Sequence, residues 1–110
     1  IDTSDYIVDV ESISYSLNDY ELFQNYPNPF NPVTTISYNI PEESIVNLSI
    51  HNILGEQVGI IVNQRQNGGK YEVTWIASDN PSGIYIYTLE AVSLFGNDQN
   101  RISRKMILLK

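Results

Sequence analysis

The chain has 110 residues, a formal net charge of −7, no cysteine and one histidine. This length suits a single domain, because folding at this size buries roughly two thirds of the surface that the unfolded chain exposes. The acidic charge argues against nucleic-acid binding, which needs cations that displace counterions from phosphates. No apolar run approaches the ~20 residues that span a bilayer, and we expect any signal for crossing a first membrane to lie upstream of Ile1.

Residues 1–21 differ from the rest of the chain in charge. Residues 6–10 and 13–17 have a strand-like composition with no Gly or Pro turn between them, so we expect residues 1–21 to be a linker or the end of a preceding domain. All their charges are acidic, whereas the last ten residues hold most of the basic charge. The two ends could attract each other, face different partners, or be solvated termini without a role. The acidic residues are Asp2, Asp5, Asp9, Glu11, Asp19 and Glu21, and the basic ones are Arg101, Arg104, Lys105 and Lys110.

A proline-rich segment follows and excludes both a helix and a central strand. Its residues are Tyr26, Pro27, Asn28, Pro29, Phe30, Asn31 and Pro32. Proline fixes φ, removes an amide donor and keeps the preceding residue out of the α region, so this leader is extended or turned. We expect Tyr26 and Phe30 to pack under the end of the domain that begins behind it.

The remaining chain predicts an all-β domain, an antiparallel sandwich of about seven strands. Short β-branched runs alternate with turn residues at the spacing typical of this fold. The Gly68-Gly69 pair is interpreted as a hairpin turn that needs positive φ, and not as a phosphate cradle, because no helix follows it. Strands are expected at residues 33–40, 45–52, 57–63, 70–76, 83–93 and 100–109.

The period-two pattern of these strands predicts the core. Trp75 is expected at its centre, and inward tyrosines should bury the ring while the hydroxyl reaches the rim. Such use of the tyrosines competes with a carbohydrate-binding face built from exposed aromatic residues. The four expected rows are Ile36, Tyr38 and Ile40; Val46, Leu48 and Ile50; Tyr71, Val73 and Trp75; and Tyr85, Tyr87 and Leu89.

The last strand is apolar on both faces. Ile102, Met106 and Leu108 share one face, and Ile107 and Leu109 lie with polar residues on the other. A strand of this kind is either central or an edge that awaits a partner, and such edges are sites of β-strand addition. The alternatives are that it pairs inside the sheet, or that it supports weak self-association.

No catalytic or metal-binding constellation is predicted, and no cofactor is expected. His51 alone, without cysteine, cannot form a Cys/His zinc site, and no G-x-S-x-G motif provides a serine nucleophile. Glu42-Glu43 and Asp79-Asn80 lie in predicted turns, where Asp and Asn are favoured for local backbone bonding. Calcium at the Asp79 turn is the one metal that this interpretation leaves open.

Several segments, in order, closely resemble the type A C-terminal sorting domains of cargo proteins of the bacterial type IX secretion system. The resemblance covers about Leu22 to Lys110, so we expect residues 22–110 to be the domain. The matching segments are residues 22–36 around the leader, 46–56 ending in Ile53-Leu54-Gly55-Glu56, 68–71 with Trp75, 81–87 with Pro81-Ser82-Gly83, and 104–110.

This resemblance implies an Ig-like, non-catalytic domain behind an upstream cargo domain. It implies recognition by outer-membrane type IX translocon components, with export through the periplasm and outer membrane of a Gram-negative bacterium to the medium or cell surface. The recognition residues it implies are Gly83, Tyr85, Arg104, Lys105, Met106, Ile107, Leu108, Leu109 and Lys110, with the leader as a second motif. The alternatives are a carbohydrate- or surface-binding Ig-like module and a passive spacer similar to the Ig-like domain of flagellar hook-capping proteins.

Overall fold

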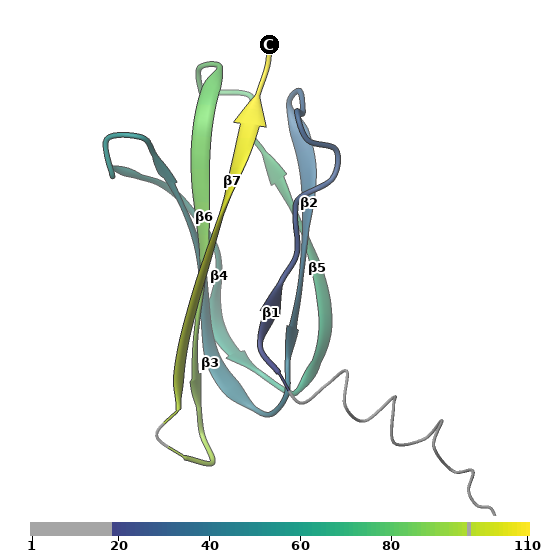
Figure 1. The fold of residues 1–110 in the computed structure, drawn as a ribbon, viewed down its shortest axis with the longest axis vertical. Coiled ribbons are helices and arrows are strands. Elements are labelled where there is room, and N and C mark those ends of the chain that lie inside the picture. The colour runs from purple at the N-terminus through teal and green to yellow at the C-terminus, as the bar shows by residue number, and fades with distance from the viewer. Residues whose placement is uncertain (1–18, 97) are drawn as a thin grey trace, which may run out of the picture.

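A computed structural model describes residues 19–96 and 98–110, which form two antiparallel sheets packed face to face (Figure 1). The expected linker segments within residues 1–18 lie outside the described residues. The three-stranded sheet has the order β1-β2-β5, from β1 (Glu21–Leu22), β2 (Val33–Ile40) and β5 (Gly69–Ile76). The four-stranded sheet has the order β4-β3-β6-β7, from β3 (Ser44–Asn52), β4 (Gln57–Gln66), β6 (Gly83–Ser93) and β7 (Gln99–Leu108).

The predicted all-β sandwich is confirmed, and the six expected strands lie within three residues of their predicted bounds, whereas β1 was not predicted. The interpretation of Gly68-Gly69 as a hairpin turn is wrong. β4 and β5 belong to different sheets, so these glycines lie where the chain crosses from one layer to the other. Gly69 has the expected positive φ, 155°. Gly68 is needed for another reason, because a Cβ there would lie 2.9 Å from the carbonyl oxygen of Pro41 in the neighbouring crossover.

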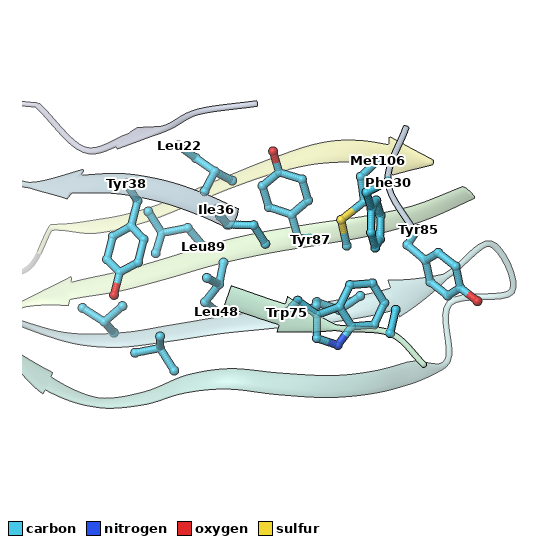
Figure 2. Packing of buried hydrophobic residues seen from close by; sticks show 14 of the residues in the cluster. Leu22, Phe30, Ile36, Tyr38, Leu48, Trp75, Tyr85, Tyr87, Leu89 and Met106 are labelled. Carbon is cyan, nitrogen blue, oxygen red and sulfur yellow. The ribbon is translucent and has the colours of Figure 1, made fainter. Parts of the chain in front are cut away.

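The predicted rows meet between the sheets, as Figure 2 shows. The rows of β2, β3 and β6 are buried, whereas in β5 only Trp75 is buried and Tyr71 and Val73 are partly covered. Trp75 belongs to the core and is 8% exposed, and its ring packs between two other aromatic rings, with centroid distances of 5.8 Å to Phe30 and 5.5 Å to Tyr85. β5 is an edge strand, which explains why its row is covered less completely.

The inward tyrosines of β2 and β6 bury the ring, as predicted, and each hydroxyl has a hydrogen-bond partner within the protein. Tyr38 donates to Gln66 Oε1 at 2.7 Å and so joins the three-stranded sheet to β4. The Tyr87 hydroxyl donates to the carbonyl oxygen of Phe23 at 2.6 Å and accepts from the backbone N–H of Asn25 at 2.9 Å. Burial raises the pKa of both phenols above the ordinary value of 10, since it disfavours the phenolate.

The described chain begins with contacts to the sandwich. The Tyr20 hydroxyl lies 3.0 Å from Ser44 Oγ, and Glu21 pairs with Asn39 as the first residue of β1. Two residues of the expected linker therefore contact the domain.

Candidate recognition surface on the last strand

β7 is an edge strand, and its alternation is the predicted one. Met106 and Leu108 are buried, whereas Ser103, Lys105 and Ile107 are exposed on the outer face of the four-stranded sheet. β6 pairs with one side of β7, and no further strand of the sheet pairs with the N–H and C=O groups on the other side.

Residues 24–30 cover this edge along its C-terminal half. Phe30 N–H donates to the carbonyl oxygen of Ile107, and Leu109 N–H donates to the carbonyl oxygen of Phe30, each at 3.0 Å. Phe30 is thus paired with Leu108 in a short parallel bridge. Two side chains continue the cover: Asn28 Oδ1 accepts from Ile107 N–H at 2.9 Å, and Gln24 Nε2 donates to the carbonyl oxygen of Lys105 at 2.8 Å. Two segments about 80 residues apart in sequence therefore share one surface.

The two aromatic residues of the leader have different positions. Phe30 is 2% exposed and packs on Trp75 and the core, as predicted (Figure 2). Tyr26 is 80% exposed, so the prediction that it packs under the sandwich is wrong. The backbone of Tyr26 exchanges two hydrogen bonds with Thr35 of β2, and this pairing fixes the residue without burying its ring.

Asn25 holds the start of residues 24–30 in place. Its Nδ2 donates to Thr34 Oγ1 at 2.9 Å and to the carbonyl oxygen of Pro27 at 3.1 Å, and its backbone N–H donates to Tyr87. Asn25 is buried, so these bonds satisfy polar groups that water does not reach.

The basic residues of the C-terminal segment have different surroundings. Arg104 lies in the inward phase of β7, and its Nε donates to the carbonyl oxygen of Leu22 in β1 at 2.5 Å. Lys110 Nζ donates to the carbonyl oxygen of Ser78 at 2.6 Å. Lys105 lies on the outer face of the sheet, and no ion pair between described residues involves any of these three cations. Lys105 is therefore a cation whose role can be tested with little effect on structural bonds.

The other candidate residues flank β7 on β6. Gly83 pairs with Leu108 and Tyr85 pairs with Met106, so both lie beside the C-terminal segment. Tyr85, Met106 and Leu108 are buried, so in the folded domain these side chains pack in the core beneath the exposed surface. Leu109 is exposed.

A shallow groove lies on the outer side of this region. Its walls combine residues 24–30 with β6 and β7, and they are Gln24, Asn28, Ile84, Lys105 and Ile107. The sequence analysis did not single out Gln24 or Ile84. Ile84 immediately follows Gly83 and lies in the outward phase of its strand. An apolar residue in a solvent-facing phase is the sequence feature that could have identified Ile84 as part of a surface.

The side chains considered for catalysis or metal binding do not lie together in a common site. His51 lies on the outer face of β3 opposite Ile86, and no group of three or more His, Cys, Asp or Glu side chains in the described part of the chain could hold a metal ion. Glu42 bonds to Ser93 and Glu43 bonds to Arg65 Nε, so the two carboxylates have separate partners. Across residues 19–96 and 98–110, no helix is long and apolar enough to cross a membrane.

Fold and surface together define a class of protein: a small β-sandwich whose distinctive feature is a C-terminal edge strand covered by its own leader. The family model described as the secretion system C-terminal sorting domain matches residues 24–108. The chain belongs to this family, and the predicted resemblance to the sorting domains of type IX secretion is confirmed. Comparison with curated proteins gives no match.

Proposed function

We propose that this domain is a non-catalytic C-terminal sorting signal, which directs an upstream cargo in the same polypeptide through the type IX secretion system. The destination of the cargo is the medium or the cell surface, reached through the periplasm and the outer membrane. The partners are outer-membrane translocon components. The main support is the family match from residue 24 to residue 108, which spans both the leader and the last strand.

The position of the proposed recognition residues is consistent with this role. The C-terminal end of β7 lies at one tip of the sandwich, opposite the connection between β2 and β3 (Figure 1). Gly83 pairs with Leu108, and the leader bonds to Ile107 from the opposite side. A translocon component can therefore contact residues of the leader, β6 and β7 at one place.

Export of a reporter tests the proposal. A reporter with a signal for the first membrane is fused ahead of residue 1 and expressed in a type IX-competent host. We expect the reporter in the medium or on the cell surface only when residues 1–110 are attached. The same fusion in a host that lacks a functional translocon should stay in the periplasm. Equal release from both hosts, or release without residues 1–110, would contradict the proposal.

A further inference from the structure

We propose that residues 24–30 and β7 form a single docking surface for an apolar, acidic protein segment, and that this partner is recognised through side chains. The inference rests on the proposed function and specifies the partner's chemistry and its mode of binding. It excludes strand addition along the C-terminal half of β7 as the mode of recognition.

The first argument is that this half of the edge is already paired. The outward carbonyl oxygen of Lys105, the N–H and carbonyl oxygen of Ile107 and the N–H of Leu109 all have partners in residues 24–30. A partner strand would have to remove these bonds before making its own. Phe30 anchors the covering segment, because its side chain is 2% exposed and packs on Trp75. These four groups are therefore not available to a partner strand.

The second argument is the apolar surface that remains. Ile84 and Ile107 are a cross-strand pair on the outer face, 45% and 38% exposed, and both line the groove with Lys105. Leu109 is 56% exposed, two residues beyond Ile107 on the same phase of the chain. Exposed apolar side chains beside fixed polar groups are typical of a protein interface.

The third argument is charge. The segments 22–41 and 99–110 contain no acidic residue, although the whole chain has 13 Asp and Glu. Four of the six Lys and Arg lie in residues 99–110. Arg101 lies beside Glu90 toward the other end of the strand, so the cations on the side of the leader are Arg104, Lys105 and Lys110, with no acidic residue in the leader or in residues 99–110. Charge complementarity then selects a partner with carboxylates next to apolar side chains.

The sheet provides a matched control for the apolar pair. Ile45 and Val92 are also a cross-strand pair on the outer face of the same sheet, and they too are 45% and 38% exposed. They lie toward the other end of the strands, beside Glu90, which lies 3.9 Å from Arg101. Threonine in either pair keeps a β-branched side chain, so both double variants should fold alike.

The test compares export of the reporter fusion for the Ile84→Thr/Ile107→Thr variant with the Ile45→Thr/Val92→Thr variant. We expect the first to lower export about tenfold or more, as when an interface loses an apolar anchor, and the second to leave it unchanged. Equal export from both variants would overturn the inference. If the wild-type fusion is still exported only in the host with a functional translocon, the proposed function stands while the inference fails. The two failures are therefore distinguishable. Melting temperatures of the purified variants confirm that both are folded.

The charge argument has its own variant pair. Lys105→Gln should lower export. Lys70→Gln should not, although it also removes an exposed cation, because Lys70 lies on the three-stranded sheet. Unchanged export of Lys105→Gln would contradict the acidic partner.

The mode of binding and the nature of the partner are tested separately. The Gln24→Ala/Asn28→Ala variant uncovers part of the β7 edge, and higher export of this variant would overturn side-chain recognition in favour of strand addition. Sedimentation of the purified domain with vesicles of equal parts phosphatidylcholine and phosphatidylglycerol distinguishes a protein from a lipid surface. We expect no binding, and binding that is lost with Lys105→Gln would overturn the assignment to a protein partner.

Discussion

β4 and β7 are the two edges of the same sheet, and they avoid unwanted pairing in different ways. β4 is protected by its own sequence: exposed polar residues fill its second half, and the β3–β4 register shifts between Leu48 and Ser49 and again between Ile50 and His51. No backbone hydrogen bond from another described segment reaches its outer side. β7 keeps a regular register with β6 over ten residue pairs and is covered by residues 24–30.

The comparison shows what a covered edge permits. Bulges interrupt the ladder and polar side chains make the edge unattractive to a partner strand, but both leave the backbone groups of the edge open. A cover made by another part of the chain removes the adhesive backbone groups directly. β7 can therefore present Ile107 to solvent opposite the buried Met106 and Leu108. β4 also exposes one apolar side chain, Ile60, but it lies beside the register shifts, so β4 combines an interrupted ladder with a polar second half, whereas β7 combines a regular ladder with a cover.

Removing the anchor of the cover should have the largest effect. Phe30→Ala should lower the free energy of unfolding by about 3–5 kcal/mol, because it empties a buried aromatic site. Val62→Ala in β4 deletes fewer buried atoms and should cost less. Urea unfolding measures both. If Phe30→Ala also exposes the β7 edge, its sedimentation should depend on protein concentration, and that of Val62→Ala should not. A Phe30→Ala variant as stable as Val62→Ala would show that the cover is not anchored in the core.

The two tyrosine hydroxyls should rank next, because each connects one edge region to the rest of the fold. Tyr87→Phe leaves the buried N–H of Asn25 without an acceptor and should cost about 1–3 kcal/mol. Tyr38→Phe leaves one acceptor, Gln66 Oε1, without its donor, whereas Tyr87→Phe removes two bonds, so Tyr38→Phe should cost less, near the lower end of about 1–3 kcal/mol. Thermal unfolding of the two variants measures the difference. The reverse order would mean that residues 23–25 are held by other contacts.

A smaller, local effect is expected from the polar part of the cover. The Gln24→Ala/Asn28→Ala variant loses two exposed hydrogen bonds to β7, each worth about 0.5–1.5 kcal/mol at most. Amide hydrogen exchange should speed up at Ile107, whose N–H loses its acceptor. Gln64→Ala on the β4 edge serves as control and should leave exchange in β4 unchanged. Unchanged protection of Ile107 would argue that Phe30 alone maintains the cover.

The mildest difference should appear only at alkaline pH. Burial raises the native pKa of Tyr38 and Tyr87 above the unfolded value of 10, so the native state holds these protons more tightly. The stability that these two phenols contribute is therefore complete below pH 10 and is lost as the pH rises through the native pKa values. Tyr87→Phe should reduce this loss of stability. A melting temperature that falls equally above pH 10 in wild type and variant would show that other groups cause it.

Local patterns predicted much of the fold and part of the site. Val33–Ile40 was predicted to the residue, and the inward phases of β2, β3 and β6 were correct, because period-two alternation is written into each strand separately. The same alternation identified the two apolar faces of β7. It could not tell whether β7 is central or an edge, because strand neighbours depend on contacts between distant segments.

The sequence alone determined the family, the β-sandwich, the strand phases and the concentration of basic charge in the last ten residues. Only the tertiary structure decided that residues 24–30 cover β7, that Phe30 is buried while Tyr26 is exposed, and that Gly68 lies at a crossover against Pro41. The physical reason is that strand propensity and side-chain alternation act between near neighbours in sequence. The cover depends on backbone groups 79 and 81 residues from the side chains that bond them, and no local pattern encodes that pairing.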